Sequence, residues 1–158
     1  MNIDGMVHVN INCTDYARSK AFYEMLGFEE VWQVPATNSA EVNAAVGMSN
    51  YRVTGAILKL KGVEPAVLID LLQWHEPEDH SPPYANLYRP GLARLALRSS
   101  DLQADYDYLV AQGVEVLSPP ATVYAGTNHG SRFFASKTRM GRSWSWLSSF
   151  SRCRSVCP

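Results

Sequence analysis

An internal repeat constrains the fold of this chain more than any other feature of its sequence. Residues 8–31 align without a gap with residues 94–117, an offset of 86 residues. Asp15 then falls on Asp101, and Gly27 falls on Gly113. Each copy runs from an alternating segment through an amphipathic segment to a glycine, which is the order of a strand, a helix and a helix end. The sequence therefore predicts two copies of one supersecondary unit.

The opening segment of each copy alternates with a period of two, as a strand with two different faces does. In the first copy His8, Asn10 and Asn12 share the polar face, and in the second Arg94 occupies the place of His8. Thr14 or Asp15 is expected to cap the first helix, and Ser100 with Gln103 the second. The expected helix stripes are Ala21, Phe22, Met25 and Leu26 in the first copy, and Leu102, Tyr106, Leu109 and Val110 in the second.

Further strand candidates follow each helix, so that the predicted fold class is α+β. The expected strands are 27–34, 51–61 and 65–74 in the first half, and 114–117, 122–124 and 131–137 in the second. The second half needs one more strand to close its sheet, and residues 37–50 are expected to be a polar loop. We predict a single domain over 1–158, with module one at 5–75, a proline-rich linker at 76–90, module two at 91–150 and a tail at 151–158.

Composition narrows the choice of partner and location. The chain has 158 residues, of which 46% are hydrophobic and 18% charged, and its net charge is −1. That balance is typical of a globular domain and favours neither nucleic acid nor an anionic membrane as a partner. We see no apolar run of transmembrane length and no signal peptide, and Cys13, Cys153 and Cys157 form no disulfide framework. A cytoplasmic protein is expected.

Several segments together resemble the vicinal oxygen chelate superfamily, which includes glyoxalase I, bleomycin- and fosfomycin-resistance proteins, epimerases and extradiol dioxygenases. They are HVNINCTDYARSKAFYEMLGF (8–28), AVLIDLLQW (66–74), GLARLALRSSDL (91–102) and SRFFASK (131–137). The resemblance implies two βαβββ modules that form a cup-shaped mixed sheet around a cleft for a small molecule, often within a homodimer. In metal-dependent members, histidines and glutamates from the first and last strand of each module hold one divalent ion, such as Zn, Ni, Mn, Fe or Mg.

Carried over by position, the resemblance makes His8 and Asp70 metal ligands, and Asp70 a candidate catalytic carboxylate. Arg94 stands where the family usually has a histidine, which departs from the pattern. Two arrangements remain open. His8 and Asp70 hold a divalent ion, or Arg94 pairs with Asp70 and binds an anionic or oxygen-rich ligand without a metal. We favour the second, because a guanidinium repels a cation and two protein ligands are few for a catalytic metal. Trp74 and Tyr51 are further candidates for binding the ligand.

Two functions follow from these arrangements. The first is a small-molecule-binding protein with a degraded metal site, and it is our preferred interpretation. The alternative is a divalent-metal-dependent lyase or isomerase, of the glyoxalase I or epimerase type, acting on a substrate with neighbouring oxygens. A third interpretation is a poorly folded product, because the tail after Lys137 lacks the pattern of a strand.

A shift of the reading frame can explain the sequence of that tail. The last strand of the family has roughly the sequence KDPDGxxLELVEF, whereas this chain has K-TRMGRSWSWLSSF after Ser136. One extra G after the Lys137 codon permits GAC CCG GAT GGG ACG GTC CTG GAG CTG, which spells DPDGTVLEL and can continue as VEF. All these codons are compatible with residues 138–149. We therefore predict a frameshift after Lys137, with a missing glutamate opposite Ser145 and a disrupted last strand.

Overall fold

The chain forms two compact units in the computed structural model, Met1–Ser81 (unit 1) and Pro82–Pro158 (unit 2). The division falls inside the segment 76–90 that the sequence predicts as a linker. Each unit has its own sheet and is described by itself. The structure describes residues 2–3, 5–36, 39–48, 51–82, 91–92, 94–125, 129–137 and 143–151, the last of these as backbone.

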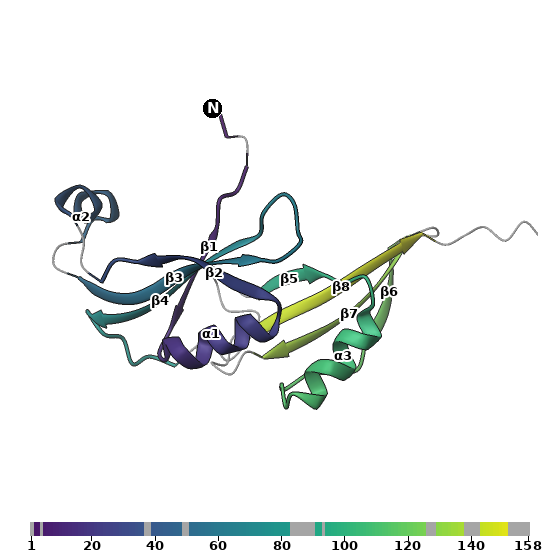
Figure 1. Cartoon of the computed structure of the whole chain (residues 1–158). Helices are drawn as coiled ribbons and strands as arrows, with labels where there is room; N and C mark the ends of the chain where they lie inside the picture. Colours follow the sequence, from purple (N-terminus) through teal and green to yellow (C-terminus); the bar gives the residue numbers. More distant parts are fainter. Residues whose placement is uncertain are drawn as a thin grey trace, which may run out of the picture. The chain divides into compact units, whose positions relative to one another are not determined.

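Unit 1 is one four-stranded mixed sheet with the strand order β1-β4-β3-β2 (Figure 1). β1 runs parallel to β4, and the other neighbours are antiparallel. A strand–helix connection therefore leads from one edge of the sheet to the other, and β4 returns to the middle. Its elements are β1 (Val9–Cys13), α1 (Tyr16–Met25), β2 (Phe28–Val34), α2 (Ala40–Val46), β3 (Arg52–Leu60) and β4 (Leu68–Glu76).

Unit 2 repeats this topology with the strand order β5-β8-β7-β6. β5 is parallel to β8, and β7 is antiparallel to both β8 and β6. Its elements are β5 (Arg94–Arg98), α3 (Leu102–Ala111), β6 (Ala121–Ala125), β7 (His129–Lys137) and β8 (Ser143–Ser151). The α+β class with two βαβββ modules, predicted from the repeat, is confirmed.

An aspartate caps each helix, and the two aspartates are equivalent in the repeat. Asp15 caps α1 by accepting from the Arg18 amide at 2.9 Å, and Asp101 caps α3 by accepting from the Ala104 amide at 3.1 Å. The expected Ser100–Gln103 box is therefore wrong, because the next residue supplies the cap. Gly27 (φ 93°) and Gly113 (φ 71°) have the left-handed conformation expected after the helix.

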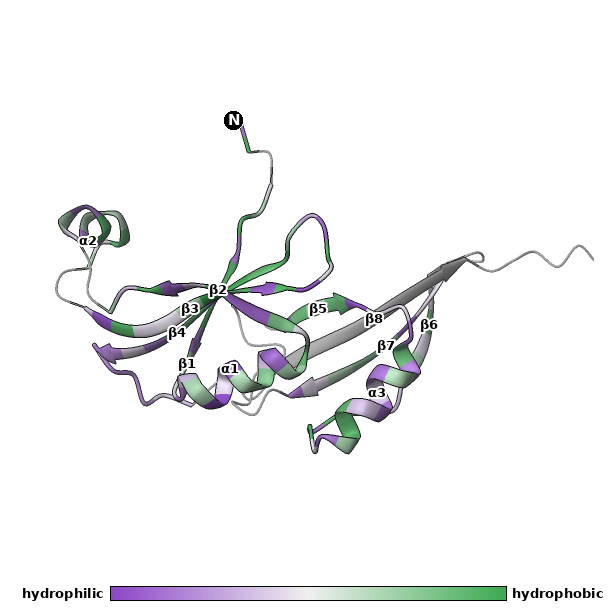
Figure 2. Cartoon of the chain, viewed as in Figure 1, coloured by the Kyte–Doolittle hydropathy of each residue, from purple (hydrophilic) through white to green (hydrophobic). Residues whose placement is uncertain are grey.

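The core of unit 1 lies between α1 and one face of the sheet. Phe22 and Tyr23 of α1 are buried, and their rings meet edge to face at 5.4 Å. Figure 2 shows hydrophobic and hydrophilic residues alternating along α1 and α3, as expected of helices covered on one side only. In unit 2, Leu102 and Leu109 are buried as expected, whereas Val110 is 46% exposed.

The structure differs from the expected secondary structure in three places. The expected loop 37–50 contains α2, which Ser39 caps through the Val42 amide and which buries no residue. The expected strand 114–117 is only an isolated bridge at Val116. Residues Ser143–Ser151, expected to be disrupted, form β8 between β5 and β7. Strands pair through hydrogen bonds between backbone groups, which any residue but proline can make. Serine and tryptophan also alternate at 143–146, as a strand with two different faces requires.

Candidate functional site

The candidate site lies on the face of the unit 1 sheet opposite α1. The Tyr16 amide at the start of α1 donates to Gln73 Oε1 at 2.8 Å, so Gln73 points to the helix side. Side chains alternate along a strand, so Asp70 and Trp74 point to the opposite side. We call this side the Asp70 face. Its polar and aromatic residues include His8, Asn10, Asn12, Asp70 and Trp74, and the strand register adds Lys59 and Trp32.

Asp70 lies at the centre of this face because β4 lies between β1 and β3 in the sheet. Asn10 stands directly opposite Asp70 in the ladder, and its Nδ2 donates to Asp70 Oδ2 at 3.0 Å. His8 Nε2 is 4.0 Å from the same oxygen. The other oxygen, Asp70 Oδ1, is buried and has no hydrogen-bond donor among the described residues. Such an acceptor usually has a partner in a folded protein, because leaving it unpaired costs about 1–3 kcal/mol.

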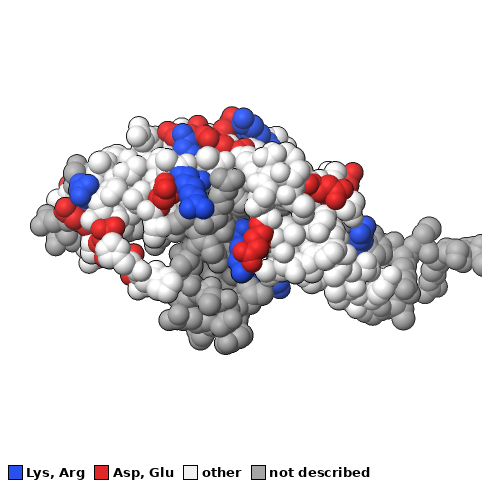
Figure 3. Space-filling view, turned by 90° about the horizontal axis from the view of Figure 1, so that it is seen from below, with Lys and Arg blue, Asp and Glu red and all other residues white. Residues whose placement is uncertain are grey.

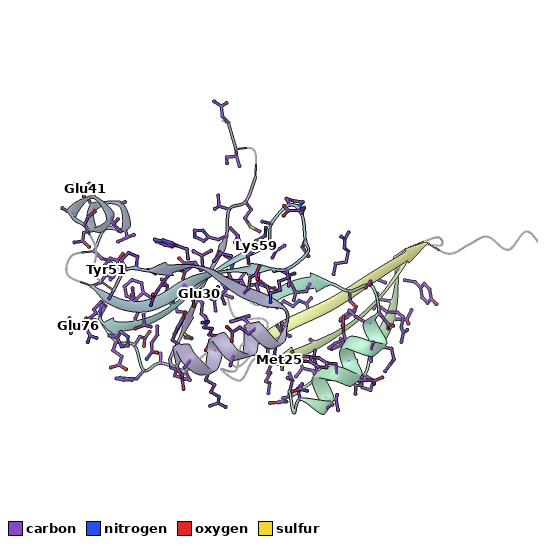
Figure 4. All side chains as sticks on the ribbon, viewed as in Figure 1. Met25, Glu30, Glu41, Tyr51, Lys59 and Glu76 are labelled. Atoms are coloured by element: carbon purple, nitrogen blue, oxygen red, sulfur yellow. The ribbon has the colours of Figure 1, made fainter. Side chains whose placement is uncertain are left out.

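An aromatic pair occupies the far end of the same face. Trp74 Nε1 donates to Asn12 Oδ1 at 2.9 Å, which fixes the indole ring beside β1. Tyr51 packs against this ring with the centroids 5.1 Å apart and the planes tilted by 42°. Figure 4 shows Tyr51 and Glu76 at one end of the sheet, with Lys59 toward the other end. The face thus combines a carboxylate with an apolar aromatic wall.

Gly55 allows β3 to pack closely against β4 beneath this face. A Cβ at Gly55 would clash with the Leu71 carbonyl oxygen and with Leu72 Cδ2. Leu72 pairs with Gly55 and lies between Asp70 and Trp74 along β4. The glycine therefore sets the backbone position of the strand that carries both candidate binding residues.

On the opposite side of the sheet, a small charged cluster ties α1 to β2. Lys20 Nζ lies 2.7 Å from Glu30 Oε2, and the Tyr16 hydroxyl donates to the same oxygen at 3.3 Å. The hydrogen bond from Lys20 lowers the pKa of Glu30 and raises that of Lys20. Burial and then the charge of Glu30 raise the pKa of Tyr16. Figure 3 shows basic and acidic residues interspersed in this way on the face that it presents.

The described residues of unit 1 offer few donors to a divalent ion. With metal bonds of about 2.1 Å, an ion joined to His8 Nε2 and Asp70 Oδ2, 4.0 Å apart, would have a ligand angle of about 145°, wider than the roughly 109° of a tetrahedral site. Asn10 directs an N–H donor, not an acceptor, at the same carboxylate oxygen. Within the part of the chain that the structure describes, no three His, Cys, Asp or Glu side chains are grouped to hold a metal.

The structure brings four of the five predicted site residues into unit 1. His8 and Asp70 lie side by side, and Tyr51 and Trp74 are in contact. Arg94 begins β5 of unit 2 and is exposed, so its expected pairing with Asp70 joins two units and stays a prediction. The sequence did not single out Asn10 and Asn12 as functional, although their place on the polar face with His8 was the signal that could have found them.

Comparison with known proteins identifies the family. Residues 5–134 match the model of the Glyoxalase/Bleomycin resistance protein/Dioxygenase superfamily. The chain belongs to this superfamily. The resemblance inferred from the sequence is thereby confirmed. Among curated proteins, none matches the chain closely enough to be counted as a relative.

Solved structures of the superfamily share the fold at low sequence identity. A glyoxalase family protein from Bacillus cereus is 14% identical over 95% of this chain and 97% of its own, with a TM-score of 0.78. A domain from Frankia sp. EAN1pec is 17% identical over 92% of both chains, with a TM-score of 0.65. The fosfomycin resistance protein FosX from Listeria monocytogenes, in complex with Mn(II) and 1S,2S-dihydroxypropylphosphonic acid, is 14% identical over 93% of both chains, with a TM-score of 0.59. At these identities the likeness establishes the fold alone.

None of the helices among the described residues has the length and apolarity needed to cross a membrane.

Proposed function

We propose that this chain is a small-molecule-binding member of the superfamily with a degraded metal site, and that the Asp70 face binds the ligand. The observation that carries the proposal is the buried Asp70 Oδ1, which lacks a donor among the described residues. A ligand with an N–H or O–H group would supply that donor after a small rotation of the carboxylate, whose terminal torsion is soft.

The rest of the face narrows the class of ligand. Tyr51 and Trp74 provide an apolar aromatic wall, and the amides of Asn10 and Asn12 add polar groups along β1. A compound that joins a flat apolar ring to a hydroxyl or amino group matches both features. The pairing of Arg94 with Asp70 predicted from the sequence would add a cation to this site.

A binding screen with a matched control tests this proposal. Ligand-observed NMR with a panel of aromatic alcohols and amines should identify compounds that bind the purified chain. We expect Asp70→Asn to weaken the best of them at least about tenfold, since it removes a charge-assisted hydrogen bond. Asp107→Asn is the control, because Asp107 is exposed on α3 and accepts from Gln103 Nε2, a neighbour on the same helix. Equal binding by both variants would contradict the proposed site.

The alternative is a metal-dependent lyase or isomerase. The proximity of His8 to Asp70 and the Mn(II) complex of FosX favour it. It requires metal ligands beyond these two side chains, and the described residues of unit 1 group no third His, Cys, Asp or Glu with them. A cytoplasmic location and a homodimer remain proposals from the sequence.

A further inference from the structure

The register of the two sheets identifies equivalent positions in the two units without reference to side chains. In unit 1 Asn10 pairs with Asp70, and in unit 2 Ala96 pairs with Ser145. Asn10 and Ala96 are equivalent in the sequence repeat, which has an offset of 86 residues. Ser145 is therefore the backbone equivalent of Asp70, and residues 143–149 of β8 are equivalent to residues 68–74 of β4.

The shifted reading frame matches this equivalence position by position. With one extra G after the Lys137 codon, residues 143–149 can read V-L-E-L-V-E-F, against L-I-D-L-L-Q-W at 68–74. Aliphatic residues fall on aliphatic residues, glutamate falls on Asp70, and phenylalanine falls on Trp74. The register comes from backbone pairing, and it agrees with a frame that the codons of residues 138–149 permit.

We propose that a one-base deletion after Lys137 has replaced the last strand of the parent protein, and that the parent carries a glutamate at position 145 that pairs with Arg94. Arg94 is the repeat equivalent of His8, and His8 Nε2 lies 4.0 Å from Asp70 Oδ2. Arg94 and position 145 therefore occupy the same backbone positions in unit 2 as His8 and Asp70 occupy in unit 1. Because arginine is always charged and binds carboxylates in a bidentate manner, this position in the parent is an ion pair within unit 2.

The replacement acts on the centre of the sheet of unit 2. β8 pairs with β5 on one side and with β7 on the other, so its residues have neighbours on both sides. Valine and phenylalanine, in place of Ser143 and Ser149, have a higher strand preference than serine, and the parent residues repeat the aliphatic pattern of β4. The parent strand should therefore stabilise unit 2 as well as restore the ion pair.

The coding DNA of an independent isolate tests the deletion directly. We expect one additional base between the codons of Lys137 and Thr138, followed by the DPDGTVLELVEF reading. Independent isolates that all encode TRMGRSWSWLSS in the present frame would overturn the proposal.

Thermal unfolding tests the strand and its ion pair, and neither outcome depends on the ligand of the Asp70 face. We expect a chain with residues 138–149 replaced by DPDGTVLELVEF to unfold several degrees above the present chain. The same tail with glutamine at position 145 should lose part of that gain, and Arg94→Met should lower the midpoint of the restored chain more than that of the present one. A restored chain no more stable than the present one would overturn the parent strand, and equal midpoints for the glutamate and glutamine tails would overturn the ion pair.

Discussion

At the scale of single residues, Asp70 is the side chain whose surroundings least match a purely structural role. One carboxylate oxygen accepts from Asn10, and the other is buried without a donor among the described residues. Folding alone would favour an apolar residue here, because β4 is otherwise aliphatic from Leu68 to Leu72. A binding residue that is kept at a cost to stability explains this arrangement.

Asp70→Asn should accordingly stabilise the chain. Removal of the charge lowers the cost of burial while an acceptor for Asn10 is kept, so we expect the free energy of unfolding to rise by about 0.5–1 kcal/mol. Urea unfolding measures the change. A loss of stability of more than about 1 kcal/mol would show that Asp70 has a structural partner. The free energy of unfolding of Asp107→Asn should stay within about 0.5 kcal/mol of that of the unchanged chain.

Gly55→Ala should strongly destabilise unit 1. The added methyl group would meet the Leu71 backbone and the Leu72 side chain, so β3 and β4 would have to separate at a cost of about 1–3 kcal/mol. Chemical denaturation measures the change. Gly5→Ala is the control, because nothing lies within 4 Å of a Cβ there and its φ is not positive. An unchanged midpoint for Gly55→Ala would contradict the close packing of the two strands.

At the scale of elements, the link between α1 and β2 gives a pH-dependent contribution to stability. The pKa of Glu30 is lowered by its hydrogen bond with Lys20, so the folded state binds the Glu30 proton more weakly than the unfolded state does. The contribution is therefore present above the unfolded pKa, about 4.3, and is lost as the pH falls through the lower folded value. Because both side chains are partly exposed, we expect less than about 1 kcal/mol.

Glu30→Gln tests this link. We expect the variant to be less stable than the unchanged chain at pH 7, and the difference to be smaller at pH 3, because the contribution of Glu30 falls as the pH drops below the unfolded pKa of about 4.3. Urea unfolding at the two pH values measures it. Glu29→Gln serves as the control, because Glu29 lies 3.7 Å from Lys61 and is more exposed. A difference that persisted unchanged at low pH would mean that Glu30 acts through packing and not through its charge.

The sequence predicted elements well where a local rule determined them. The alternation at 8–12 and the glycines at 27 and 113 have local signals, and both were found. Helix α2 was missed because Ala40–Val46 has only seven residues and its larger apolar side chains, Val42 and Val46, are exposed. The strand at Ser143–Ser151 was missed because its pairing with β5 and β7 is a tertiary contact that composition does not record. For the same reason the hydrogen bonds of Asn10 and Asn12 could not be read from the sequence.

At the scale of the whole molecule, the chain is two copies of one unit that have diverged in their polar positions. The backbone pairing is the same in both, yet Asn10 becomes Ala96 and His8 becomes Arg94. The superfamily fold is thus retained, while the groups that would hold a metal differ between the copies. Membership of the family therefore establishes the architecture, and the function depends on the residues of each face.

The measurement that tests our central claim most directly is the metal content of the full chain, purified without chelators and analysed by elemental mass spectrometry. We predict well below one equivalent of any divalent metal, and no shift of the unfolding midpoint when EDTA is added, since bound metal would stabilise the folded state. One equivalent of tightly bound metal that is lost in both His8→Ala and Asp70→Asn would contradict the account and favour the metal-dependent enzyme.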